Sequence, residues 1–92
     1  MQPQGQPNDV SATGAVYAKG PGRIKGVVLT PAAAAATLVL HDNASAASGT
    51  VLARLQAPAN GNSAVFVGLD IPFANGVYAT LGGAGAAAVV YL

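Results

Sequence analysis

Short runs of apolar and β-branched residues, each closed by Gly, Pro, Asn or Asp, follow one another along most of this chain. Such runs, at a spacing of about 8–12 residues, indicate antiparallel β-strands. The segments expected as strands are 15–18, 23–30, 37–41, 50–56, 64–69, 76–81 and 86–92. About seven short strands in one small domain suit a sandwich or a small barrel, and we expect an all-β fold, a compact antiparallel β-sandwich.

The first 13 residues differ from the rest, since they are rich in Gln, Pro, Asn and Gly. Proline and glycine in such a segment discourage both helix and sheet interior. We therefore expect an extended N-terminal arm over residues 1–13 and the β-sandwich domain over residues 14–92. The arm is either a free tail or a tether that adds a strand to a neighbouring subunit or to another partner. Its candidate contact residues are Gln2, Pro3, Gln4, Gln6 and Pro7.

Alternation within two of these strands predicts which side chains share a face. In the segment 23–30, one face would carry Ile24, Val28 and Thr30, and the other Arg23, Lys25, Val27 and Leu29. In the segment 50–56, one face would carry Val51, Ala53 and Leu55, and the other Thr50, Leu52, Arg54 and Gln56. The alanines at 32–36 are too few for an independent helix, so we expect a tight connection or the start of a strand.

Charge is scarce, with 8% of the residues charged against about 25% in a typical soluble domain. A small, alanine-rich core buries little area per residue, and small domains of this kind rely on disulfides, metals or oligomers. The chain has no Cys and one His, which excludes disulfides and argues against a zinc site. Oligomerisation remains, and we expect other protein to cover part of the surface.

The same composition argues against several partners. A net charge of +1 does not favour nucleic acid, which requires many phosphate contacts. No apolar run approaches the roughly 20 residues of a membrane span. The first residues lack the basic and apolar regions of a secretory signal, so we expect synthesis in the cytoplasm.

The few cations are the candidate contact residues outside the arm. Lys19, Arg23 and Lys25 lie close together in sequence, and they form either a solvated hairpin edge or a patch for an acidic partner surface. Arg54 is either solvated and paired across strands, or in contact with a carboxylate of another subunit, since Arg is favoured at interfaces.

No segment predicts a reaction. Gly83 to Ala88 fit a loose dinucleotide pattern, but too few residues follow for the required helix and strand, so we expect a hairpin turn. His41 and Asp42 point to opposite faces if they lie on a strand, and Asp42 with Asn43 more readily opens a turn. Asp70 is expected to accept backbone N–H groups in a loop. The five aromatic residues serve either the core or a stacking platform. We expect no catalytic, cofactor or metal site and no small-molecule substrate.

Several segments of the chain carry short strand and turn motifs. A G-R-I-x-G-V strand at residues 22–27 is followed by a strand and turn at residues 38–49. An F-x-x-G-V-Y-A-T-L-x-G strand pair at residues 73–83 and a terminal V-V-Y strand at residues 89–91 complete the set. Together these segments resemble small virion proteins encoded by tailed bacteriophages, and the resemblance extends over about residues 14–92.

The resemblance implies a capsid decoration, or cement, protein located in the virion, on the capsid surface. Such a protein would bind the major capsid protein, associate with itself as a homotrimer, and stabilise the capsid by bridging its subunits. The alternative is a small tail or head-fibre component with a role in binding host glycans. Neither reading involves an enzyme, a cofactor, nucleic acid or a membrane.

Overall fold

The computed structural model describes residues 7–18 and 20–92, which are all-β and contain no helix. The strands are β1 (Pro7–Val10), β2 (Gly14–Tyr17), β3 (Gly22–Thr30), β4 (Ala36–His41), β5 (Val51–Ala57), β6 (Ala64–Phe73), β7 (Val77–Gly82) and β8 (Ala87–Tyr91). The expected β-sandwich is therefore confirmed. Each of the seven expected strands is present, and β1 is the additional one.

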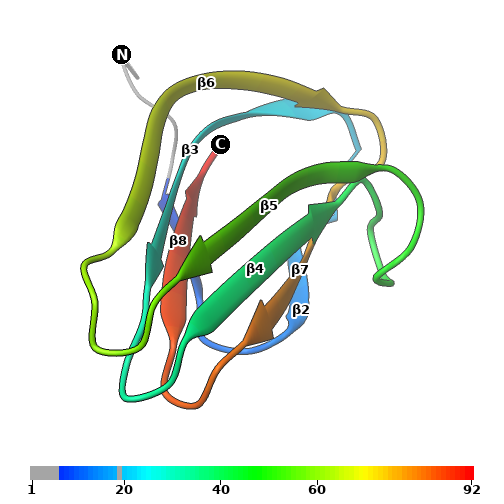
Figure 1. Ribbon diagram of the computed structural model, residues 1–92. Coiled ribbons are helices and arrows are strands. Elements are labelled where there is room, and N and C mark those ends of the chain that lie inside the picture. Colours follow the sequence, from blue (N-terminus) through cyan, green and yellow to red (C-terminus); the bar gives the residue numbers. More distant parts are fainter. Residues whose placement is uncertain (1–6, 19) are drawn as a thin grey trace.

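The strands form two antiparallel sheets of four that pack face to face, as Figure 1 shows. Sheet A has the order β1-β8-β3-β6, and sheet B has the order β2-β7-β4-β5. Consecutive strands mostly alternate between the two sheets, which is the strand order of a double Greek-key jelly roll. The edges of the sandwich are β1 and β6 in sheet A, and β2 and β5 in sheet B.

Strand β1 lies in the segment that we expected to be an arm. It pairs with β8 from Pro7 opposite Tyr91 to Val10 opposite Ala88, and the Val10 side chain is buried. Asn8 adds a bond from its Nδ2 to the carbonyl oxygen of Val90, at 3.3 Å. A proline is tolerated at the first residue of an edge strand because no ladder bond needs its N–H. Gln2, Pro3, Gln4 and Gln6 lie outside the described residues.

The core is aliphatic and fills the space between the sheets. Its fully buried side chains come from both sheets: Ile24, Leu29, Leu38, Leu40, Val27, Val77 and Val90. At one end, Tyr17 meets the buried ring of Phe73 edge-on, with ring centroids 5.6 Å apart. No polar or charged residue is buried among those described. Burial of these apolar side chains is the main source of stability in such a domain.

The face assignment for β3 was wrong. Ile24, Val27 and Leu29 are all fully buried, although strict alternation puts Ile24 on the opposite face from the other two. The register explains the difference, because Ile24 lies opposite Ile71 whereas Gly26 lies opposite Val67. Residues 68–70 of β6 thus face one residue of β3, and Gly68 has a positive φ of 70°. Such a β-bulge turns the side-chain pattern from one face to the other.

Strand β5 follows the expected alternation in its second half only. Leu55 and Ala57 are buried, whereas Arg54 and Gln56 are exposed. In the first half the register shifts, since Leu40 pairs with Ala53 and His41 pairs with Val51. Val51 is consequently exposed, in contrast to the expected face. The alanine run forms bends until Ala36, where β4 begins, in agreement with the expected connection.

Candidate interaction surface

Strand β6 carries most of the large apolar side chains that the described part of the chain leaves exposed. Val65 is 54% exposed, Phe66 47% and Val67 71%. Phe66 lies opposite the core residue Val27, at the margin of the sandwich. Val65 points outward, because its partner Val28 alternates with the buried Val27 and Leu29. Val67, two positions further along β6 and opposite Gly26, lies on the same side.

The register extends this surface across sheet A. On the outer side, Val65 lies opposite Val28, and Val28 lies opposite Val89. In the next row, Val67 and Tyr91 lie on either side of Gly26. We call this surface the outer apolar face; it consists of Val28, Val65, Val67, Val89 and Tyr91.

Glycine at position 26 permits the close packing of this face. A Cβ atom there would lie 3.1 Å from the carbonyl oxygen of Phe66 and 3.7 Å from Cδ1 of Tyr91. The contact with the Phe66 carbonyl is tight, whereas the distance to Tyr91 is an ordinary van der Waals contact, so glycine at this position lets strands β3 and β6 approach each other. Glycine inside a strand often marks such a place, where another backbone comes close.

Charged and polar groups surround the outer apolar face. Arg23 donates from Nη1 to Oδ1 of Asp70 at 3.0 Å, and both side chains are exposed. Lys25 is exposed on β3, and Asp9 is exposed opposite Val89. At the other end, the hydroxyl groups of Thr30 and Ser63 are hydrogen-bonded at 3.0 Å. An apolar centre with a polar rim is the usual anatomy of a protein interface.

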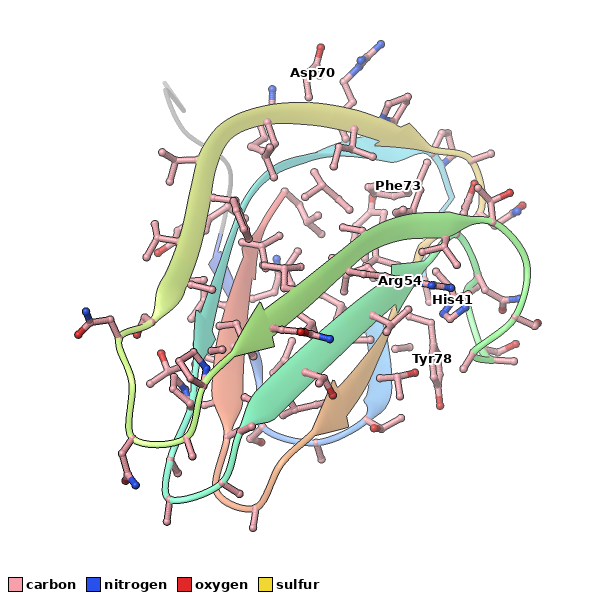
Figure 2. The ribbon with its side chains drawn as sticks, viewed as in Figure 1. His41, Arg54, Asp70, Phe73 and Tyr78 are labelled. Atoms are coloured by element: carbon pink, nitrogen blue, oxygen red, sulfur yellow. The ribbon has the colours of Figure 1, made fainter. Side chains whose placement is uncertain are left out.

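The candidate cations do not form one patch. Arg23 and Lys25 lie on sheet A, whereas Arg54 is exposed on β5 of sheet B, opposite Val39 (Figure 2). Lys19 lies outside the described residues, and so does the Pro7 side chain. The expectation for Asp70 was wrong, because Asp70 lies within β6 and accepts a bond from Arg23 instead of from a loop backbone.

The carboxylate of Asp42 binds the backbone of a neighbouring turn. It accepts N–H bonds from Asn75 at 2.8 Å, from Ala74 at 3.0 and 3.1 Å, and from Gly76 at 3.4 Å. The hydrogen bonds from Ala74 and Asn75 hold the pKa of Asp42 below its ordinary value of 3.8. The loop after β4 is thereby joined to the turn before β7.

The neighbouring groups also serve turns. Asn43 Oδ1 accepts N–H bonds from Ser45 at 2.8 Å and Ala46 at 3.0 Å, as expected for a residue that opens a turn. Gly83 and Gly85 have positive φ in the turn between β7 and β8, where we expected a hairpin. The hairpin was wrong, because β7 belongs to sheet B and β8 to sheet A, so this turn connects the two sheets. His41 lies opposite Tyr78 on sheet B, and its Nδ1 is buried without a partner among the described residues (Figure 2).

The aromatic side chains are divided between core and surface. Phe73 is buried and Tyr17 packs on it, whereas Phe66 and Tyr91 lie on sheet A and Tyr78 lies on sheet B. A hollow of about 550 Å³ lies beside Tyr17 and Phe73, and Arg23 is the one charged residue among the described residues that line it. Three or more His, Cys, Asp or Glu side chains do not gather anywhere in the described part of the chain. No helix described there could cross a membrane.

Comparisons of the chain with protein-family models, with curated proteins and with solved structures find no match.

Proposed function

We propose that this chain is a structural protein of a bacteriophage particle, which binds the outside of the capsid and reinforces the contacts between capsid subunits. The observation that carries the proposal is the outer apolar face. Val65 and Val67 are more than half exposed in a chain with few charged residues, and water contact with apolar surface is unfavourable. A protein surface that covers these valines would remove that cost.

The composition of the face suits a protein partner. Its centre consists of valines and one tyrosine, and Arg23, Lys25, Asp70 and Asp9 lie around it. Tyrosine and arginine are enriched in interfaces, and the polar rim fixes orientation while the apolar centre supplies affinity. A sheet with one broad apolar side is therefore suited to lie against a capsid surface.

The fold is compatible with this role without requiring it. Jelly rolls occur in viral capsid proteins, but also in lectins and cupins, so the fold by itself carries no function. Weak contacts that are repeated over a particle add up through avidity, which makes one small face sufficient. The absence of catalysis and the localisation in the virion remain predictions of this proposal.

Two measurements test the proposal. Purified chain is mixed with capsids that lack it, and co-sedimentation is followed to saturation, with an unrelated jelly-roll protein as control. Saturation at hundreds of copies per particle, together with greater resistance of the capsid to heat, would support a cement protein. Binding that never exceeds the control would contradict it.

The alternative, a tail or head-fibre component that binds glycans, is kept because Phe66 is exposed on the strand that follows the polar loop at Asn60, Gly61 and Asn62. Stacking of sugars on an exposed ring would use this feature. A handful of copies in each purified particle, with binding to host glycans that Phe66→Ala abolishes, would favour this alternative over the cement role.

A further inference from the structure

One edge of sheet A has an unoccupied side. Strand β6 is bonded to β3 only, and no strand among the described residues pairs with its other side (Figure 1). Each edge strand presents a row of backbone N–H and C=O groups that another strand can bind. The segment 64–69 of β6 also carries the most exposed large apolar side chains of the described chain, Val65 and Val67.

The first part of this segment lacks the charges and prolines that protect other edges, and the β-bulge begins only at Gly68. Charged residues and proline discourage edge-to-edge pairing. The opposite edge of sheet A, β1, contains Pro7 and Asp9, and the second half of β6 contains Asp70 and Pro72. Residues 64–69 contain neither a charged residue nor a proline, and the bulge at residues 68–70 leaves residues 64–67 as the regular, unprotected part of strand β6.

We propose that segment 64–69 binds the same segment of a second copy of this chain, in an antiparallel pair across a twofold axis. With Phe66 on the axis, Val65 lies opposite Val67 of the other copy, and Ala64 lies opposite Gly68. The nearest charged residue, Asp70, lies beyond Gly68 in the bulge, outside the paired segment. No like charges meet, and the segment is complementary to itself, as a twofold interface requires.

The pairing also accounts for the exposed valines. A twofold axis perpendicular to sheet A keeps the outer sides of the two sheets on one side of the pair. The valines of both copies then become cross-strand neighbours, which stabilises an antiparallel pair. The two outer apolar faces join into one surface of twice the width. This inference concerns the chain by itself and holds whether or not the virion role is correct.

The mass in solution tests the proposal directly. A concentration series by light scattering is expected to give twice the chain mass. Val67→Lys, at a position whose exposure leaves folding unaffected, is expected to weaken the association at least tenfold, because it places a charge in the contact. Val51→Lys is the matched control, since Val51 is an exposed valine on sheet B, and it should leave the association unchanged.

Cysteine pairing tests the register. The chain has no cysteine, so a mixture of Val65→Cys and Val67→Cys chains reports only the introduced pair. Directly opposite residues of antiparallel strands lie about 4.5–5.5 Å apart at Cα, within reach of a disulfide. The mixture is expected to form more disulfide dimer than either variant alone.

Three results would overturn the proposal. These are a monomer throughout the series, a trimer, or an oligomer that Val67→Lys leaves intact. A monomer whose Val67→Lys variant fails to bind capsids would assign β6 to the particle contact instead. If Val67→Lys abolished the dimer but still bound capsids, the proposed virion role would be unaffected.

Discussion

Asp42 is the residue whose charge is most closely tied to the fold. Because hydrogen bonds from Ala74 and Asn75 lower its pKa in the folded state, the folded protein prefers the ionised carboxylate more than the unfolded chain does. The resulting stability is fully present above the unfolded pKa, near 3.8, and is lost as the pH falls through the lowered folded value. We expect the urea midpoint to be flat from pH 7 to about 5 and to fall below about pH 4.

The substitution Asp42→Asn separates this effect from the other carboxylates. An amide oxygen still accepts a hydrogen bond from the loop, but it has no charge to lose. We therefore expect a lower urea midpoint at pH 7 and a smaller fall of the midpoint below about pH 4. Asp9→Asn is the control, because Asp9 is an exposed residue on edge strand β1. If the urea midpoint of Asp42→Asn fell at low pH as much as that of the parent chain, Asp42 would not be the source of the acid sensitivity.

Gly76, in the turn before β7 whose N–H groups bind Asp42, leaves no room for a side chain. Its φ is 153°, and an added Cβ would contact the carbonyl oxygen of Tyr17 and the backbone of Asn43 and Ala44. Gly76→Ala is therefore expected to destabilise the fold by about 1–3 kcal/mol, measured by urea unfolding. Gly14→Ala is the control, since nothing lies within 4 Å of its added Cβ, and it should change stability by less than about 0.5 kcal/mol.

At the scale of elements, strand positions could be predicted from local sequence, whereas neighbours and faces could not. The segment Pro7–Val10 contains Pro, Asn and Asp, which are poor strand formers, and it becomes a strand only because β8 lies beside it. The bulge opposite Lys25 depends on Gly68, more than 40 positions away in sequence. The alternation of apolar and polar residues within 23–30 does not predict this bulge.

The candidate surface illustrates the same limit. An uninterrupted apolar run such as Ala64–Leu69 is typical of a buried strand, and only its position at the edge of sheet A exposes it. The scarcity of charge predicts a surface that other protein covers, but composition does not say which strand provides it. Likewise, nothing local separates Arg23 and Arg54, which the topology places on different sheets.

Strand β1 has a consequence for any truncation of the N-terminal segment. Removal of residues 1–10 deletes β1, uncovers one side of β8 and removes the buried Val10 from the core. Because β8 is uncharged, its free edge would favour aggregation. We expect a lower thermal midpoint and visible aggregation on heating, detected by light scattering.

Removal of residues 1–6 is the matched control, since it retains β1. Its thermal midpoint should stay close to that of the full chain, and it is the variant with which to test the arm as a capsid contact. A chain lacking residues 1–10 that is as stable as the full chain would contradict the structural role of β1.

The whole molecule is small, and its stability should depend on its association. Anything that binds only the folded state stabilises it by mass action, so a dimer gains about 1.4 kcal/mol for each tenfold rise in concentration above its dissociation constant. The thermal midpoint of the parent chain is therefore expected to rise with concentration. That of Val67→Lys should stay constant, because Val67 lies in the proposed contact and is 71% exposed in the single chain. Equal concentration dependence in the two proteins would place the association elsewhere on the surface, and a constant midpoint in both would mean that the uncharged surface is tolerated by the chain alone.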